Sequence, residues 1–223
     1  MSAPGFPAGT LDDEGFPVWI TALESDDPNH TVHVVRGLAP ADALHLLGAQ
    51  PDTVVSCQLP ARRPDGNVSL PRAAIGPTSS EAVLLAGQFG SWTFVYDDLG
   101  LTGYENGGGF APSAKMLSAG GREAASSTWT INADTSLAYA VDGNLLLDVA
   151  EDLDPAEDDI PAGLRGAVEA AGTFSGGDGE DRGEPDIDCG TNMRVVCALA
   201  GLHVLLDDLR QIPLLAAEVN GLL

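Results

Sequence analysis

Basic residues are scarce in this chain of 223 residues. Lysine and arginine together number 10, against 33 aspartates and glutamates, which gives a formal net charge of −23. Such a surface is repelled by the phosphates of nucleic acids and by anionic membrane surfaces. We therefore expect neither a nucleic acid nor a membrane to be a direct partner.

Cysteines and long apolar runs are also scarce. Cys57, Cys189 and Cys197 are widely spaced and form no CxxC pair, which is more typical of reduced cytoplasmic thiols than of a disulfide framework. The longest strongly apolar stretch, at 195–206, has 12 residues, whereas a membrane-spanning helix needs about 20. Residues 1–10 contain no lysine or arginine, which disfavours a secretory signal. We expect a cytoplasmic protein.

The common catalytic and cofactor motifs are absent from the sequence. No serine has glycine at both −2 and +2, and the single lysine, Lys115, follows an alanine, so there is neither a nucleophile elbow nor a P-loop. His30 and His33 are three residues apart in an expected strand, where side chains alternate between faces, so they are poorly placed to share a metal ion. We expect no cofactor, no metal centre and no catalytic residue.

The succession of short strand and helix signals predicts an α+β fold. We expect a flexible acidic, Gly/Pro-rich lead-in at 1–17, then a single domain over 18–223 with an acidic, glycine-rich loop at about 173–190. The domain would hold an antiparallel sheet of about five or six strands built from hairpins, packed by a long buried C-terminal helix and short helices. Candidate strands are 31–36, 52–59, 82–89, 92–97, 124–131, 137–141 and 144–149, and candidate short helices are 40–47, 112–119 and 162–171.

The clearest hairpin signal joins 82–89 to 92–97 through a Gly-Ser turn. Glycine at the first turn position predicts a type II′ turn. Counting outward from the turn places Gly87 opposite Phe94, so that the missing side chain leaves room for the ring. The other side of this hairpin is more polar, and we expect the sheet to have one core face here.

A second hairpin signal joins 137–141 to 144–149 through an Asp-Gly turn, which favours type I′. Pairing outward sets Ala138 and Ala140 against Leu147 and Leu145. Because both faces of this hairpin are largely apolar, we expect it in the middle of the sheet.

The C-terminal region is rich in leucine. Residues 193–209 are apolar on most sides of a helix, which predicts one long buried helix. Within it, His203 and Asp207 are four residues apart, where a hydrogen-bonded pair is possible. Such a pair is half of a catalytic constellation, although it is also an ordinary arrangement at the edge of a core. We expect a final helix at 213–219.

Several segments, taken in order, resemble a known family. They are TVHVVRGLAPADALHLLGA at 31–49, GSWTFVY at 90–96, KMLSAGGREA at 115–124, AYAVDG at 138–143 and the leucine-rich C-terminal helix. The first is the most specific: a strand, then Arg36-Gly37-Leu38, then a helix that starts at proline and ends in Leu-Gly-Ala. The family is an uncharacterised actinobacterial one, a domain of unknown function, and the resemblance covers roughly 19–215. It implies a high-GC bacterial cytoplasm, in keeping with nine arginines and one lysine, and it implies no activity.

The favoured hypothesis is a non-catalytic interaction protein whose acidic surface binds a basic protein partner. Examples are an immunity protein that blocks a basic toxin or nuclease, and a regulator of a nucleic-acid enzyme. The carboxylates expected to bind the partner are Asp178, Glu180, Asp181, Glu184, Asp186 and Asp188, followed by Glu151, Asp152 and Asp154. The alternative for these residues is a solvated surface that only aids solubility.

The competing hypothesis is a small-molecule-binding or enzymatic domain with a pocket between sheet and helix, near His203. The residues of that pocket would be His203, Asp207, Arg36 and Trp92. A closed polar cleft lined by these side chains would favour this hypothesis over the first.

Overall fold

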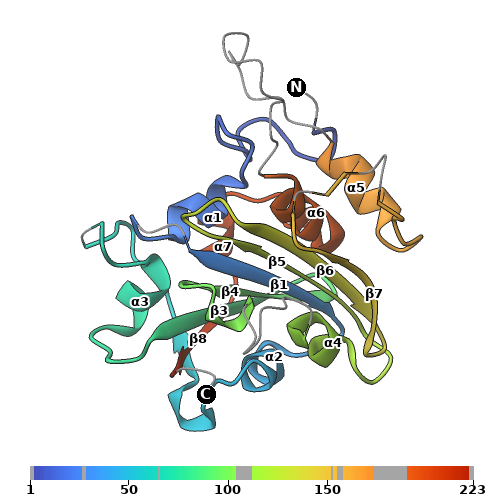
Figure 1. Ribbon diagram of the computed structural model, residues 1–223. Helices are drawn as coiled ribbons and strands as arrows, with labels where there is room; N and C mark the ends of the chain where they lie inside the picture. Colours follow the sequence, from blue (N-terminus) through green and yellow to red (C-terminus); the bar gives the residue numbers. More distant parts are fainter. Residues whose placement is uncertain are drawn as a thin grey trace.

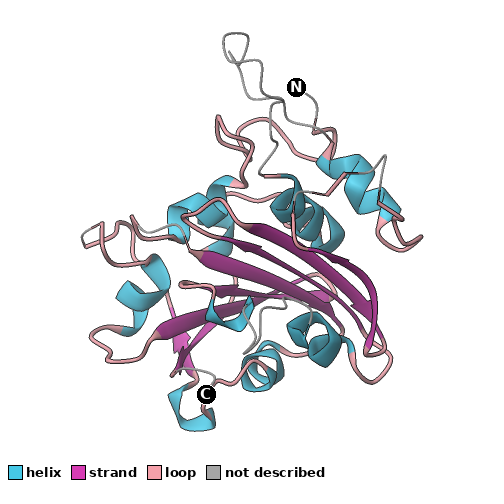
Figure 2. Ribbon diagram, in the orientation of Figure 1, coloured by secondary structure: helices cyan, strands magenta, loops and turns pink. Residues whose placement is uncertain are grey.

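The eight strands that the structure describes form one antiparallel sheet, flanked by short helices (Figure 2). The computed structural model describes residues 3–26, 29–64, 66–103, 112–151, 153–154, 158–172 and 190–220. The strand order is β2-β8-β3-β4-β1-β5-β6-β7, and each neighbouring pair is antiparallel. The expected α+β class and antiparallel sheet are confirmed, and the sheet has more strands than expected.

The elements follow one another in short segments along the chain. The strands are β1 (His30–Arg36), β2 (Val55–Cys57), β3 (Ala82–Phe89), β4 (Trp92–Asp97), β5 (Glu123–Trp129), β6 (Thr135–Val141), β7 (Asn144–Val149) and β8 (Leu214–Val219). The α-helices are α1 (Val18–Leu23), α2 (Pro40–Leu46), α3 (Leu70–Ile75), α4 (Pro112–Ser118), α5 (Arg165–Ala171), α6 (Thr191–Ala200) and α7 (Leu206–Leu209). The described residues also include two single-turn 3-10 helices, η1 (Pro51–Thr53) and η2 (Leu101–Gly103).

Helices cover both faces of the sheet. Figure 1 shows α1, α5 and α6 on one side, and α2 and α4 on the other. Val34 and Leu85 belong to the larger core, on the α6 face, whereas Val35 and Leu84 pack in a second core on the face of α2 and α4. The expectation of a single core face at the β3–β4 hairpin is therefore wrong. Apolar residues at successive positions of a strand bury both of its faces.

The β3–β4 hairpin has the expected register. Gly87 pairs with Phe94 and Leu85 with Tyr96. A Cβ atom at position 87 would lie 2.7 Å from the ring of Phe94 and 2.9 Å from Leu214. The absence of a side chain at this position is therefore what allows the Phe94 ring to pack against the strand.

The β6–β7 hairpin lies at the edge of the sheet, so its expected central position is wrong. Ala140 pairs with Leu145 as expected, but a register shift then pairs Tyr139, and not Ala138, with Leu147. The shift is a β-bulge, which adds one residue to a strand and increases its twist. Leu146 is 50% exposed, so β7 presents an open edge with an apolar side chain on it.

The expected long C-terminal helix is interrupted. Gly201 adopts a left-handed conformation, with φ of 70°, and ends α6, as glycine commonly does one residue beyond a helix. The short helix α7 follows at Leu206–Leu209. The expected final helix is instead strand β8, which lies between β2 and β3. An apolar run of this length fits either state by periodicity, and the pairing partners on both sides select the strand.

Residues 3–17, in the expected lead-in, pack along α5 and α6. The Gly5 amide donates to the Ala170 carbonyl at 2.9 Å. Phe16 is buried, with its ring centroid 5.0 Å from that of Trp129. The fully buried Arg194 guanidinium donates to the carbonyls of Gly15 and Ala171 at 3.0 Å each. Arg194 thus links this segment to both helices.

Candidate functional site

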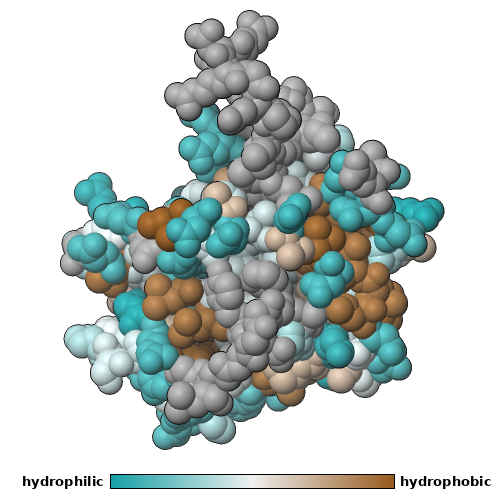
Figure 3. Space-filling model, viewed as in Figure 1, coloured by the Kyte–Doolittle hydropathy of each residue, from teal (hydrophilic) through white to brown (hydrophobic). Residues whose placement is uncertain are grey.

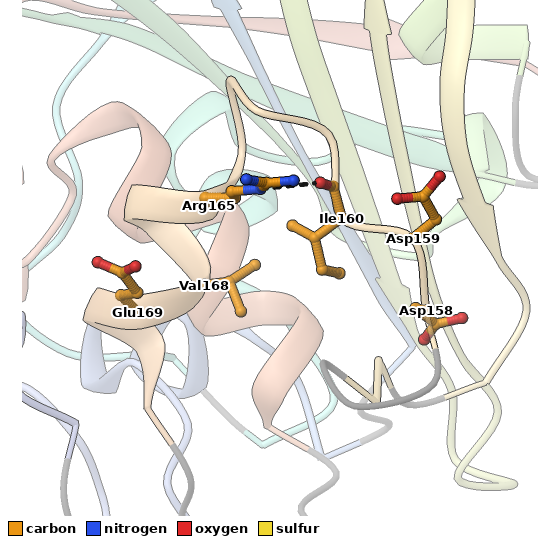
Figure 4. Close-up of a pocket in the computed structure, with 6 residues that line it drawn as sticks. All are labelled: Asp158, Asp159, Ile160, Arg165, Val168 and Glu169. Carbon is orange, nitrogen blue, oxygen red and sulfur yellow. Dashed lines mark hydrogen bonds between the residues drawn. The ribbon is translucent and has the colours of Figure 1, made fainter.

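A pocket with carboxylates at its rim lies beside α5. It has a volume of about 330 Å³ and is lined by Asp158, Asp159, Ile160, Arg165, Val168 and Glu169. In Figure 4 the apolar side chains of Ile160 and Val168 face the middle of the pocket, Asp158 and Asp159 lie together on one side of it, and Glu169 lies on the other side with its carboxylate turned away from Val168. Arg165 Nε donates to the Ile160 carbonyl at 3.3 Å. The pocket therefore has an apolar floor, and three carboxylates and one arginine line it.

Further carboxylates are exposed on the edge strand β7 and after it, outside the lining of this pocket. Asp148, Glu151 and Asp154 are exposed along the chain that leads from β7 towards the pocket. The Asp158 carboxylate accepts a hydrogen bond from the Asp154 amide at 2.9 Å. Figure 3 shows apolar side chains at the right of the view, where Figure 1 draws β7, with hydrophilic side chains beside them. We call the exposed edge of β7 together with this pocket the acidic edge.

The sequence-predicted partner-binding carboxylates are only partly located by the structure. Glu151 and Asp154 are exposed and belong to the acidic edge. The others lie outside the described residues: Asp152, Asp178, Glu180, Asp181, Glu184, Asp186 and Asp188. Asp158, Asp159 and Glu169 are not among the carboxylates predicted from the sequence to bind a partner, although Asp158 and Asp159 belong to an acidic run at 151–159.

A second pocket lies at the end of the sheet where β1 ends and β5 begins. Its volume is about 490 Å³, and its lining is Arg36, Gly121, Arg122, Glu123, Tyr139 and Val141. Tyr139 Oη donates to Glu123 Oε1 at 2.7 Å. Burial, and then the hydrogen bond and the charge of Glu123, raise the pKa of Tyr139 above its ordinary value. The Tyr139 hydroxyl therefore stays protonated and acts as a donor.

The structure brings together two of the four residues proposed for the alternative pocket. Arg36 and Trp92 are directly opposite on β1 and β4. His203 lies in the loop after α6, with its ring centroid 4.5 Å from that of Phe6. Burial lowers the pKa of His203. Asp207 lies in α7 and pairs with Arg210 at 2.6 Å, so the helical His203–Asp207 pair does not form.

A buried hydrogen-bond network, which the sequence analysis missed, lies on the α4 side of the sheet. His33 Nδ1 is 2.7 Å from Ser126 Oγ, and His33 Nε2 is 2.8 Å from Thr102 Oγ1. Thr102 Oγ1 in turn donates to Asp97 Oδ2 at 2.6 Å. All four side chains are at most 4% exposed, so the network is enclosed and every member has a partner.

Metal ligands do not gather in the part of the chain that the structure describes. No group of three or more histidine, cysteine, aspartate or glutamate side chains there could hold a metal ion. Cys57 and Cys197 are free thiols, and burial raises the pKa of both. A raised thiol pKa disfavours the thiolate, which is the form that reacts and binds metals.

The comparisons with known proteins place the chain in a family. Residues 17–201 match the model of a family of unknown function, DUF6461, and the chain belongs to that family. Neither curated proteins nor solved structures gave a match. Among the described helices, none combines the length and the apolar character needed to cross a membrane.

Proposed function

We propose that this chain is a non-catalytic interaction protein whose acidic edge binds a basic protein partner. The observation that carries this proposal is the pocket beside α5, which has an apolar floor and carboxylates at its rim. Lysine and arginine side chains combine an apolar stem with a charged end. The floor formed by Ile160 and Val168 suits such a stem, and the carboxylates of Asp158, Asp159 and Glu169 suit the charge.

The surroundings of the pocket support a protein partner. Strand β7 ends the sheet, and its outer edge can pair with an added strand. The exposed Leu146 offers apolar contact area beside the carboxylates of Asp148 and Glu151. A net charge of −23 would speed the encounter with a basic partner and disfavour acidic ones.

The proposal extends to the identity of the partner and to the location of this protein. The charge would fit an immunity-like protein that blocks a basic toxin or nuclease, or a regulator that occupies the substrate site of a nucleic-acid enzyme. A cytoplasmic location in an actinobacterium completes the proposal, supported by the reduced type of cysteine usage and the excess of arginine over lysine.

The test compares two variants that lose the same charge. The first, Glu151→Gln/Asp159→Asn/Glu169→Gln, removes three carboxylates of the acidic edge. The second, Asp13→Asn/Asp42→Asn/Asp52→Asn, neutralises exposed carboxylates elsewhere. The probe is a synthetic peptide of alternating lysine and valine, and its affinity is measured by calorimetry at several salt concentrations.

We expect the first variant to bind the peptide about tenfold more weakly than the natural chain, because exposed charge pairs contribute about 0.2–1 kcal/mol each. The second variant should stay within twofold. The natural chain should lose affinity as salt rises, because salt screens exposed charges. Equal losses in both variants would show that only net charge matters, and the acidic edge would then not be the binding site.

A further inference from the structure

The pocket beside Arg36 shares no lining residue with the pocket of the acidic edge. Arg36 pairs with Trp92 across β1 and β4, and Glu123 pairs with Val141 across β5 and β6. The last β1–β5 pair is Val35 with Ala124, so Arg36 and Glu123, the next residue on each strand, continue the same row. Residues in such a row share one face of the sheet. The volume of about 490 Å³ lies within the range of small-molecule pockets, roughly 300–1,000 Å³.

Arg36 is available to a ligand. Its side chain is 61% exposed, and its nearest acidic neighbour, Glu123 Oε2, is 3.8 Å from Nη1. That distance is too long for a hydrogen bond, and among the described residues no acceptor takes a hydrogen bond from the Arg36 guanidinium. The other oxygen of Glu123 is held by Tyr139.

Other arginines of the chain are used differently. Six of them donate hydrogen bonds to carbonyls or carboxylates within the fold: Arg63, Arg72, Arg122, Arg165, Arg194 and Arg210. Arg36 therefore combines three features: it lines a pocket, it is exposed, and its guanidinium donates no hydrogen bond to the described residues.

The lining specifies the class of ligand. We infer that this pocket binds a small monoanion, a carboxylate or a sulfonate-like group carried on an apolar, aromatic-sized body. The guanidinium of Arg36 presents a planar pair of donors that matches such an anion. The ring of Tyr139 and the side chain of Val141 supply apolar walls, and Trp92 lies beside Arg36 on the same face.

Two carboxylates near the pocket limit the charge of the ligand. Glu123 belongs to the lining, and Asp142 Oδ1 accepts the Gly121 amide at 2.7 Å at its border. These two carboxylates offset the two arginines of the lining, Arg36 and Arg122, so a ligand with several negative charges, such as a polyphosphate, would gain no net attraction. A single negative charge can lie on Arg36 and remain at the far side of the guanidinium from Glu123.

The test uses two dyes that differ in charge. The probe 8-anilinonaphthalene-1-sulfonate is an aromatic monoanion, and N-phenyl-1-naphthylamine has the same aromatic body without the sulfonate. Fluorescence titrations measure their affinities for the natural chain, for Arg36→Gln, and for Arg62→Gln, which removes an exposed arginine elsewhere. Urea unfolding of each variant verifies that the fold is retained.

We expect the natural chain to bind one equivalent of the anionic dye. Arg36→Gln should weaken this binding at least tenfold and leave the neutral dye within twofold, while Arg62→Gln should change neither. A further variant, Val141→Trp, should fill the pocket and block both dyes. The inference is overturned if the anionic dye does not bind or if Arg36→Gln leaves the affinity for this dye unchanged. It is also overturned if Arg36→Gln weakens the binding of both dyes equally. The peptide test of the acidic edge is independent of each of these outcomes.

Discussion

The buried imidazole of His33 should make the stability of the protein depend on pH. Burial lowers the pKa of His33 from 6.5 to about 3. When the folded-state pKa lies below the unfolded-state pKa, the unfolded chain takes up a proton first as the pH falls. Stability is therefore lost as the pH falls below about 6.5, at about 1.4 kcal/mol per pH unit, until the folded-state pKa is reached. Between pH 7 and pH 5 the expected loss from this one group is about 2 kcal/mol.

Urea unfolding between pH 5 and pH 7 measures this effect. His33→Gln removes the imidazole and should flatten the pH dependence by about 2 kcal/mol over that interval. The matched control is His45→Gln, which removes an exposed imidazole from α2 and should retain the pH dependence of the natural chain.

Burial raises the pKa of Asp97 and Asp98. Their contribution has the opposite sign, because a raised carboxyl pKa lets the folded state take up the proton first. Since both variants retain these aspartates, comparing the slopes isolates His33. The reasoning would be refuted if the unfolding free energies of His33→Gln and His45→Gln changed between pH 7 and pH 5 by amounts that agree within about 0.5 kcal/mol, which is roughly the error of such extrapolations.

The same network predicts the tautomer of His33. Asp97 accepts hydrogen bonds at both oxygens from the backbone amides of Leu99, Gly100 and Thr102, so its carboxylate acts as an acceptor and the Thr102 hydroxyl must donate to it. Thr102 Oγ1 then accepts from His33 Nε2–H, which leaves Nδ1 to accept from Ser126. Nitrogen-15 chemical shifts of the ring should show the Nε2–H tautomer, and an Nδ1–H tautomer would contradict this assignment.

Three further substitutions test the packing. Gly87→Ala should cost about 1–3 kcal/mol in urea unfolding, because the added methyl overpacks the contact with the Phe94 ring; no loss would mean that the ring can move aside. Gly201→Ala should cost about 1–2 kcal/mol, because φ of 70° is strained for a residue with a Cβ atom, although no neighbouring atom lies within 4 Å of that Cβ. Arg194→Met keeps much of the side-chain volume but leaves the Gly15 carbonyl without this donor, and should cost about 1–3 kcal/mol. Hydrogen exchange near residues 3–17 should then accelerate, and unchanged exchange would show that Arg194 does not hold that segment.

Local sequence signals predicted the elements whose neighbours lie close along the chain. The β3–β4 register followed from one glycine turn and the spacing of Gly87 and Phe94. The helix at α2 followed from Pro40 at its first position and an acidic first turn. In these cases the turn or the cap decides the geometry, and both can be read within about ten residues.

The elements that were predicted wrongly depend on pairing partners that are distant in the sequence. β8 is a strand because β2 and β3 flank it. The position of β6–β7 at the edge depends on β1 pairing with β5, and not on the apolar character of the hairpin itself. Gly201 was a local signal that could have been used, since a glycine near the end of a helical pattern commonly ends the helix.

The candidate sites were predictable to a similar, limited extent. Arg36 and Trp92 could be proposed together from their residue types, but their contact depends on the β1–β4 pairing, which joins segments about sixty residues apart in the sequence. The His33 network needs Ser126 from β5 and Thr102 from η2. No periodicity within one segment relates these three side chains, so the sequence alone could not bring them together.

The two proposed surfaces meet at the turn that precedes α5, and one substitution there tests whether they are coupled. Ile160 and Arg165 line the acidic pocket. Between them, a Cβ atom at Gly163 would lie only 2.3 Å from the hydroxyl of Tyr139, the group that donates to Glu123 in the Arg36 pocket.

We expect Gly163→Ala to displace the Tyr139 hydroxyl from Glu123, because a contact of 2.3 Å cannot be accommodated without movement. Freed from Tyr139, the Glu123 carboxylate can approach Arg36 and compete with an anionic ligand, so the affinity for the anionic dye should fall. Tyr139→Phe removes the same hydrogen bond without moving the turn and is the matched control. If both variants weaken the dye but only Gly163→Ala weakens the lysine–valine peptide, the turn itself connects the two sites. If binding of the dye is then found to change the affinity for the peptide, binding of the peptide must change the affinity for the dye by the same factor, because coupling free energies are reciprocal. If Gly163→Ala changes the dye affinity and leaves the peptide unaffected, the two sites act separately.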